Sequence, residues 1–390
     1  MVGSESLCPP PPTGLLRSTS AATTLTQEVL RACLASAVRT AGSQGRAAVA
    51  LGITRSYLSE LISGRRKIGR SLVERLPALG MAASSARWLG GLLRAPAPPG
   101  GRPAVGGAEE RLRELRLAYE RQFSHTPGAG GNVTALTEIP TGAAGLAIEL
   151  SSTLRASALL QVEALLLRSY AQVLVGEAAD ALWCALCAQQ LGLEALGGQD
   201  RTFALARAAI ARSQAYLVLG LGVPHWQAAT DVLAAAAELP PRVASGIPIA
   251  GHRAHLGGLL ARRRPSIAEV RWHIAKIEEH VDRGHCRPGD GGLELLLSYP
   301  LAMQAAVARG NRLNLRWAER LTAQGRELLA GDGGALGPVP RLIFLEASAG
   351  ALHSLGDRTA RRETLAEIRE IAQANGMHRP AARAEALLAE

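Results

Sequence analysis

The stretch SQGRAAVALGITRSYLSELISGRRKIGRSLVERL, Ser43–Leu76, decides how the first part of this chain folds. It places two helix-length segments on either side of Gly52, a residue that readily adopts the left-handed backbone of a tight turn. Thr54 is a good N-cap for the second segment, and Gly64 is the kind of residue that ends a helix. The stretch therefore predicts two short helices joined by a turn, the second beginning at Arg55.

Apolar residues recur at helical spacing in both segments, so each helix is expected to bury one face. The packing face of the first segment is formed by Ala47, Ala48 and Leu51, with Ala48 as the small residue at the crossing. The helically spaced residues of the second are Tyr57, Leu58, Leu61 and Ile62, of which Leu58 and Leu61 point inward. The polar residues left on or near the outer face are Arg55, Ser56, Ser59 and Glu60.

This stretch, with flanking helices from about Thr26 to Leu79, resembles the Xre/Cro–phage-repressor family of helix-turn-helix domains. The family has a Gln opening the first helix, small residues and Gly at fixed places, a Thr or Ser cap, and a Gly followed by bases. The matching residues here are Gln44, Ala48, Gly52, Thr54, and Gly64 with Arg65 and Arg66. Ala47 departs from the pattern, since the family more often has Leu there. The likeness covers about 55 of the 390 residues.

The resemblance implies an all-α domain of about five helices that reads duplex DNA with the helix beginning at Arg55. The base contacts it implies are Arg55, Ser56, Tyr57, Ser59 and Glu60. The phosphate contacts it implies are Gln44, Arg65, Arg66 and Lys67. An arginine at the helix start can donate two hydrogen bonds to guanine, which discriminates between bases by ~1–3 kcal/mol. Glu60 either accepts from a cytosine amine or restrains a neighbouring arginine, and the sequence leaves both open.

Charge is distributed unevenly along the chain and favours the same interpretation. Residues 1–95 hold twelve Arg or Lys against four acids, whereas the other 295 residues hold 31 bases against 29 acids. A basic block on an otherwise balanced protein is typical of binding to a polyanion. Because only Lys67 and Lys276 are lysines, the Arg bias itself is that of a G+C-rich genome, but this does not explain the clustering.

Composition shifts predict the domain organisation. We expect a disordered arm over 1–24, a helix-turn-helix domain over 25–94, a Pro- and Gly-rich linker over 95–107, and a helical repeat domain over 108–390. Within the last of these, a charged helix is expected over 108–123 and a long loop over 125–142.

Turn residues recur at a nearly fixed period in the second part of the chain. The breaks at Gly176, Gly222, Arg264–Pro265, Gly310 and Gly356 are 46, 42, 46 and 46 residues apart. Each break lies between two helix-length segments, which indicates helical hairpins stacked as an α-solenoid with tetratricopeptide-like units. An irregular helical bundle with similarly spaced turns is the alternative.

A helix-turn-helix followed by tetratricopeptide-like repeats resembles the architecture of Gram-positive quorum-sensing receptors. The resemblance implies a homodimeric transcription regulator whose repeats bind a peptide or protein effector on their concave face. The polar candidates on that face are Arg212, Gln214, His252, His255, Gln304 and Arg341. A DNA-tethered protein-interaction scaffold without a small effector is the alternative function.

Other signals argue against further chemistry. Cys184 and Cys187 form a CxxC in an apolar helical segment and are interpreted as core residues, and five scattered cysteines favour a reducing compartment. The spacing of His273, His280, His285 and Cys286 matches no known metal-ligand pattern. The sequence also contains no recognisable catalytic motif. We therefore expect a cytoplasmic, nucleoid-associated protein that is not an enzyme, has no cofactor and binds no metal or membrane.

Overall fold

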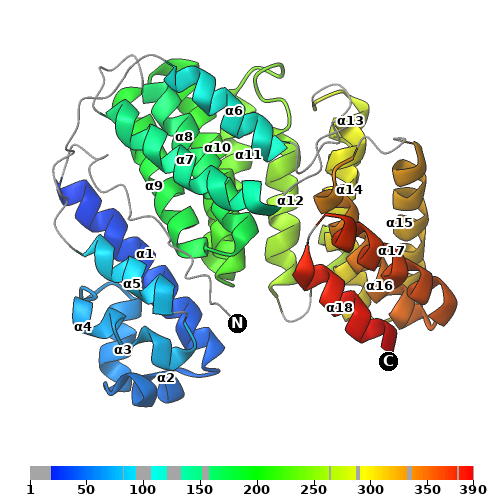
Figure 1. The fold of residues 1–390 in the computed structure, drawn as a ribbon, viewed down its shortest axis with the longest axis horizontal. Helices are drawn as coiled ribbons and strands as arrows, with labels where there is room; N and C mark the ends of the chain where they lie inside the picture. Colours follow the sequence, from blue (N-terminus) through cyan, green and yellow to red (C-terminus); the bar gives the residue numbers. More distant parts are fainter. Residues whose placement is uncertain are drawn as a thin grey trace. The chain divides into compact units, whose positions relative to one another are not determined.

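Alanine and leucine supply most of the apolar residues of this chain. In the computed structural model, all regular secondary structure of the described residues is helical (Figure 1). Both residue types have high helix propensity, whereas strands favour β-branched and aromatic residues. The all-α class predicted from the sequence is thereby confirmed. The structure describes residues 19–81, 83–93, 107–120, 133–151, 158–262, 265–286, 290–331, 336–375 and 377–389.

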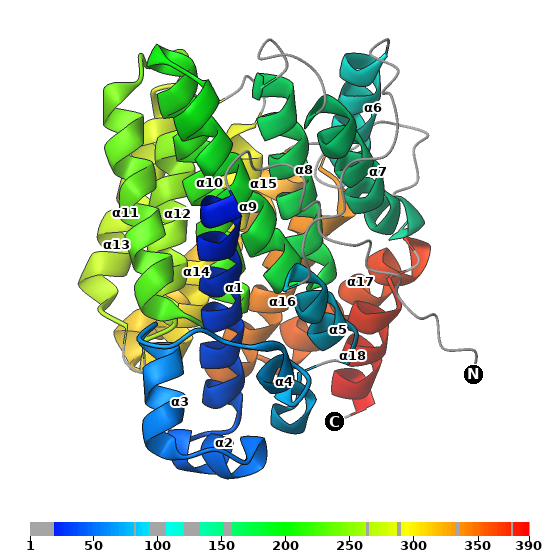
Figure 2. The same ribbon diagram turned by 90° about the vertical axis from the view of Figure 1, so that its left-hand side faces the viewer.

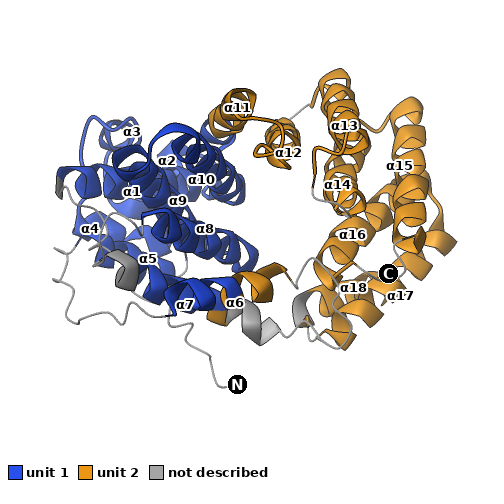
Figure 3. Cartoon of the chain, turned by 90° about the horizontal axis from the view of Figure 1, so that it is seen from above, with its two compact units in different colours: residues 1–113, 139–225 blue, residues 114–138, 226–390 orange. Residues whose placement is uncertain are grey.

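The chain divides into two compact units (Figure 3). Unit 1 comprises residues 1–113 and 139–225, and unit 2 comprises residues 114–138 and 226–390. Unit 1 thus combines the N-terminal helices with the first helices of the predicted repeat region. This division differs from the boundary expected at residue 108.

The N-terminal block, residues 19–81 and 83–93, contains α1 (Thr19–Thr40), α2 (Gln44–Leu51), α3 (Arg55–Ile62), α4 (Arg70–Val73), η2 (Leu76–Leu79) and α5 (Ala83–Leu92). Unit 1 also contains α8 (Ala158–Val175), α9 (Ala178–Ala195) and α10 (Gly198–Val218). The helices that cross a unit boundary are α6 (Ala108–Glu120), α7 (Val133–Ser151) and α11 (Gly222–Glu238). Unit 2 continues with α12 (Ile247–Leu260), α13 (Ile267–Asp282), α14 (Gly291–Arg309), α15 (Arg312–Gly331), α16 (Pro338–Leu355), α17 (Arg358–Ala374) and α18 (His378–Ala389).

Successive helices pair as hairpins across four of the five turns predicted from the sequence. Helix α8 packs on α9, α12 on α13, α14 on α15, and α16 on α17. Gly176, Gly310 and Gly356 lie in three of these turns with φ of 87°, 63° and 78°, a left-handed backbone that glycine adopts without strain. The first helices of neighbouring hairpins also pack together, α8 on α10 in unit 1 and α12 on α14 on α16 in unit 2. One predicted break is displaced, since the left-handed residue after α10 is Gly220 rather than Gly222.

Two helices begin earlier than the sequence predicts. Helix α1 begins at Thr19, inside the arm expected to reach residue 24, and the Thr24 hydroxyl donates to the Ser20 carbonyl at 3.0 Å. Residues 1–18 of that arm lie outside the described part. Helix α7 begins at Val133, within the expected loop 125–142, and contains Pro140. The adjoining Ile139 is buried. The stabilisation from this packing therefore exceeds the loss of the backbone hydrogen bond that proline cannot form.

The N-terminal block packs directly on the first repeat helices within unit 1. Helix α1 runs beside α9 (Figure 2). The Tyr216 hydroxyl of α10 donates to the Glu28 carboxylate of α1 at 2.9 Å, and the Arg39 guanidinium donates to the Gly220 carbonyl. The predicted linker 95–107, of which residues 95–106 lie outside the described part, is therefore not the sole connection between these two parts.

Helix α8 has the length and hydropathy of a membrane span, and among the described helices it alone does. In the protein 61% of its apolar 18-residue window is buried. Its Arg168 is fully buried and pairs with Asp180 of α9. These are the properties of a core helix.

Candidate nucleic-acid interface

Helices α2 and α3 are both held at their N-termini by side-chain caps. The Ser43 hydroxyl accepts from the backbone N–H of Arg46 at 3.2 Å, and the Thr54 hydroxyl accepts from that of Tyr57 at 3.1 Å. Gly52 ends α2 with φ 63° and ψ 39°. The cap, the turn and the first residue of α3 agree with the sequence prediction, because each depends on local backbone chemistry.

The inner faces of both helices are also as predicted. The buried residues are Ala47, Ala48 and Leu51 in α2 and Leu58 and Leu61 in α3. Tyr57 and Ile62 are half-buried. Since these contacts fix the roll of α3 about its axis, they also fix which of its side chains face outward.

Three of the five predicted base-contact residues are exposed on α3: Arg55, Ser56 and Ser59. They occupy one side of the helix within its first one and a half turns. A guanidinium and two hydroxyls are groups that hydrogen-bond to base edges in a major groove. This outer face therefore carries the donors and acceptors that base recognition needs.

The other two predicted base-contact residues are engaged by a neighbouring arginine. Glu60 forms an ion pair with Arg66, with Oε2 at 2.6 Å from Nε, and the Arg66 guanidinium lies 5.2 Å from the centre of the Tyr57 ring. The Arg66 backbone N–H also donates to the Glu60 carbonyl at 3.2 Å. Of the two roles open for Glu60, the structure shows the one in which it restrains an arginine.

The predicted phosphate contacts are concentrated in the basic loop, which we define as residues 64–68. Arg65, Arg66 and Lys67 are all exposed there, while Gln44 is half-buried at the start of α2. The basic loop directly follows α3, so its positive charge lies at the end of the helix opposite to Arg55. Such charges supply sequence-independent, salt-sensitive affinity for a nucleic-acid backbone.

The Gln27 side chain of α1 holds the basic loop in place. Its Nε2 donates to the Ile68 carbonyl at 3.1 Å, and its Oε1 accepts from the Ile68 backbone N–H at 2.8 Å. Ile68 is itself buried against the block. Sequence reasoning missed this contact, because the two residues are 41 positions apart and a glutamine in an amphipathic helix carries no signal of its partner.

We expect Gln27→Met to destabilise the basic loop and its attachment to α1. The substitution keeps the length of the side chain but leaves the N–H and the C=O of Ile68 without their partner, at a cost of about 1–3 kcal/mol. Chemical denaturation of the full chain measures the loss. Gln44→Met is the matched control, because Gln44 is also a half-buried glutamine and lies outside this contact. Equal stability of the two variants would contradict the role given to Gln27.

The six predicted effector residues do not share one environment. Arg212 and Gln214 lie half-buried on α10 in unit 1, whereas the other four are in unit 2. Gln304 of α14 is exposed, and Arg341 of α16 lies 4.0 Å from the Glu367 carboxylate. His252 and His255 are 6% and 5% exposed, so they are core residues instead of groove residues.

Both histidines belong to a cluster of five imidazoles in unit 2, formed by His252, His255, His273, His280 and His285. The Nδ1 atoms of His252 and His273 are 3.1 Å apart, and those of His280 and His285 are 2.9 Å apart. A hydrogen bond within each pair requires that one of the two rings is neutral and has an unprotonated Nδ1 to accept. Within the described ranges no three His, Cys, Asp or Glu side chains have the arrangement of a metal site.

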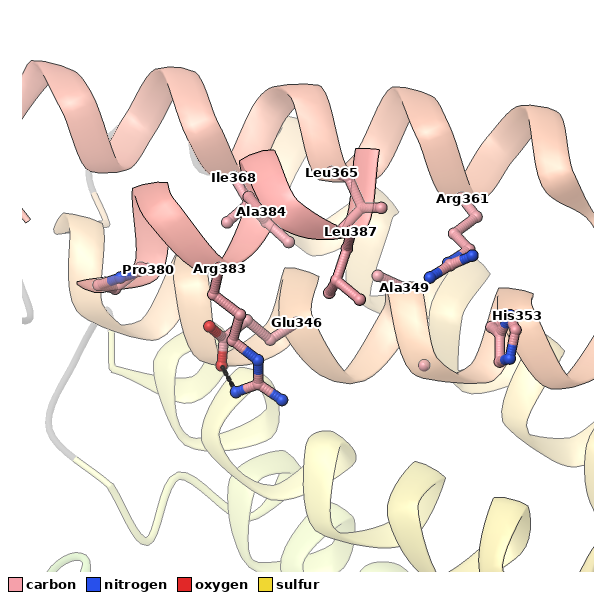
Figure 4. Close-up of a pocket in the computed structure, with 11 residues that line it drawn as sticks. Glu346, Ala349, His353, Arg361, Leu365, Ile368, Pro380, Arg383, Ala384 and Leu387 are labelled. Atoms are coloured by element: carbon pink, nitrogen blue, oxygen red, sulfur yellow. Dashed lines mark ion pairs between the residues drawn. The ribbon is translucent and has the colours of Figure 1, made fainter. Parts of the chain in front are cut away.

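A groove in unit 2 lies between α16, α17 and α18 (Figure 4). Its apolar wall includes Leu365, Ile368 and Leu387, and Arg361 and Arg383 lie along its edges. Arg383 is 4.0 Å from Glu346. The volume is about 280 Å³, and none of the six predicted effector residues lines it.

Cys184 and Cys187, the CxxC of α9, are free thiols and fully buried. Burial raises the pKa of both thiols, which keeps them protonated and unreactive. They pack in the core of unit 1, as interpreted from the sequence.

Comparison of the chain with protein-family models, with curated proteins and with solved structures gives no match.

Proposed function

We propose that this protein is a sequence-specific DNA-binding transcription regulator whose N-terminal block is a helix-turn-helix domain of the Xre type. The observation that carries the proposal is α3: a capped, eight-residue helix with an exposed polar face, followed at once by an exposed basic loop. Base edges are read by the polar face and phosphates are held by the loop. The block contributes most of the chain's net charge of +10.

Arg55 is assigned to base recognition because it is exposed at the first position of α3. Arg55→Ala should relax preference at one position of the bound site, by ~1–3 kcal/mol, while leaving affinity for unrelated duplexes nearly unchanged. Sites selected from a random duplex pool by each protein, and compared position by position, measure this. An unchanged preference at all positions would remove Arg55 from the reading face.

Arg65 is assigned to backbone contact because it is exposed in the basic loop, beyond the end of α3. Arg65→Ala should weaken binding to every duplex and lower the slope of log affinity against log salt by about 0.9. Arg358→Ala, on the exposed start of α17, removes the same charge from unit 2 and should leave the slope as in the wild type. If both variants shift the slope equally, net charge and not a local contact is responsible.

We further propose that the chain acts as a homodimer and that the helical hairpins form tetratricopeptide-like repeats that receive a peptide or protein effector. A single reading helix presents little surface, so paired half-sites are needed for tight, specific binding. The repeats and the basic loop are physically connected through α1. The Glu28–Tyr216 hydrogen bond joins repeat helix α10 to α1, and Gln27 on α1 holds the basic loop. An effector that shifts α10 would therefore act on the loop through α1.

The second candidate, a DNA-tethered scaffold without a small effector, is favoured by exposed apolar side chains on unit 2, among them Trp272 and Leu313, 53% and 72% exposed. Aromatic residues such as Trp272 are enriched at protein–protein interfaces relative to the rest of the surface. The two candidates differ in whether a molecule bound to the repeats changes the affinity for DNA. Peptide fractions that alter DNA affinity support the regulated form, whereas a stoichiometric protein partner that leaves DNA affinity unchanged supports the scaffold.

A further inference from the structure

An open cavity of about 450 Å³ lies beside the candidate reading helix, between α1 and the basic loop. Its lining residues are Ser20, Thr23, Thr24, Gln27, Arg31, Gly64, Arg66 and Lys67. Neither the base-contact face of α3 nor the predicted phosphate contacts include the α1 residues of this group. The α1 side of the cavity is thus an addition to the predicted DNA-contacting surface, whereas Arg66 and Lys67 on its loop side already belong to that surface.

The α1 side of the cavity is a polar stripe. Ser20, Thr24, Gln27 and Arg31 follow one another at spacings of four, three and four residues, which places them on one face of the helix. The buried Leu25 and Val29 lie on the opposite side of the helix. The stripe therefore turns hydroxyls and a guanidinium towards the basic loop.

The charge of the lining is positive. Three cations line the cavity, Arg31, Arg66 and Lys67, and none of its lining residues is acidic. Glu60, through its ion pair, offsets the charge of Arg66 alone. Hydroxyls and guanidinium groups around an open, positively charged cavity suit an oxyanion with several acceptor oxygens.

Hydrogen bonds within the N-terminal block fix the shape of the cavity. The two Gln27 hydrogen bonds fix the loop to α1, and the Arg31 Nε donates to the Gln27 carbonyl at 3.0 Å. Gly64 has φ 78°, and a Cβ at this position would overlap the Arg31 guanidinium. Glycine here gives both the left-handed turn and the room in which Arg31 lies against the loop.

We propose that this cavity is a phosphate-binding site, filled in the DNA complex by a backbone phosphate that flanks the bases read by α3. The inference rests on the proposed function and extends the DNA-contacting surface to α1. The shared chemistry is a phosphate group with exposed oxygens. A free phosphorylated small molecule carries the same group, so the experiment has one arm for each source.

The DNA arm measures binding of the full chain to a selected duplex over a range of salt concentrations. Arg31→Met keeps the aliphatic stem against Gly64 but removes the charge; we expect the salt slope to fall by about 0.9 and affinity to fall on the order of five-fold at 0.15 M salt. Arg31→Lys keeps the charge and should restore the slope. Arg87→Met is the matched control, because Arg87 is an exposed arginine of α5 that does not line the cavity.

The phosphate arm titrates the full chain and Arg31→Met with inorganic phosphate by calorimetry. Saturable binding to the wild type that Arg31→Met loses, together with the expected slopes, supports the proposal. An Arg31→Met slope equal to that of the wild type overturns the assignment to DNA, and phosphate binding in that case assigns the cavity to a free phosphorylated ligand. If the wild type binds no duplex, the proposed function fails, and the phosphate arm alone decides the nature of the cavity. Thermal unfolding of Arg31→Met shows whether a loss of binding is due to misfolding. Thr24→Val, which removes an exposed hydroxyl of the same lining, is unfolded alongside it for comparison.

Discussion

Asp180→Ala should lower the free energy of unfolding by about 3–5 kcal/mol, one of the two largest effects expected from this structure. Arg168 and Asp180 are 0% and 1% exposed, and the carboxylate Oδ2 accepts from Arg168 Nη2 at 2.5 Å and from Nε at 3.1 Å. Gln172 Nε2 donates to the same oxygen at 2.6 Å. Removing the carboxylate leaves a guanidinium in the core of unit 1 without its counter-charge, which is the reason for the large cost.

Two further variants isolate the cause. Arg168→Met combined with Asp180→Leu removes both charges and should recover most of the lost stability, because a buried pair and an apolar replacement differ little in net energy. Glu74→Ala breaks the exposed Arg70–Glu74 pair and should change stability by less than about 1 kcal/mol. Urea denaturation of the full chain compares all three. If the double variant is as unstable as Asp180→Ala, lost packing and not an uncompensated charge explains the effect.

Stability of unit 2 should fall steeply as pH decreases below about 6.5, because of the histidine cluster. Burial, with additional repulsion from neighbouring imidazoles, lowers the pKa of His252 to about 4 and that of His273 to about 3. Burial also lowers the pKa of His280. A group with a lowered pKa in the folded state binds its proton more readily when unfolded. Its contribution is therefore fully present above pH 6.5 and is lost as pH falls towards the folded pKa, at no more than about 1.4 kcal/mol per pH unit for each of His252 and His273.

Denaturation at pH 7, 6, 5 and 4.5, followed by tryptophan fluorescence, tests this dependence. Trp272 stacks edge-on against His252 and His273 and reports on the cluster directly. His273→Leu should flatten the pH profile, whereas His353→Leu, at an exposed position of α16, should leave it unchanged. A wild-type unfolding free energy that is constant from pH 7 to pH 5 would show that the imidazoles are not held neutral by burial.

The elements that the sequence predicts well are those specified by neighbouring residues. Thr54 caps α3 with its own hydroxyl, Gly52 turns the chain, and the spacing of Leu58 and Leu61 sets the inner face of α3. Gly176, Gly310 and Gly356 mark hairpin turns for the same reason. In each case a few residues decide the backbone, and no distant contact needs to be known.

Contacts between distant parts of the chain carry no such signal. Gln27 meets Ile68 across 41 residues and Tyr216 meets Glu28 across 188, and both depend on how whole helices pack. The same limit applies to the burial of two of the six candidate effector residues. The architectural resemblance suggests His252 and His255 as polar candidates on a concave face, whereas packing against neighbours on α11 and α13 buries them. The start of α1 and the proline within α7 also depend on packing that periodicity does not describe.

The central proposal is that α3 and the basic loop bind duplex DNA with a sequence preference. The most direct test incubates the purified full chain with a random duplex pool at low and at moderate salt and sequences the bound fraction. We expect enrichment of a defined site, with Arg55→Ala losing preference at one position of it. No bound duplex even at low salt, or equal recovery of all sequences under both conditions, would contradict the assignment of a reading helix at Arg55.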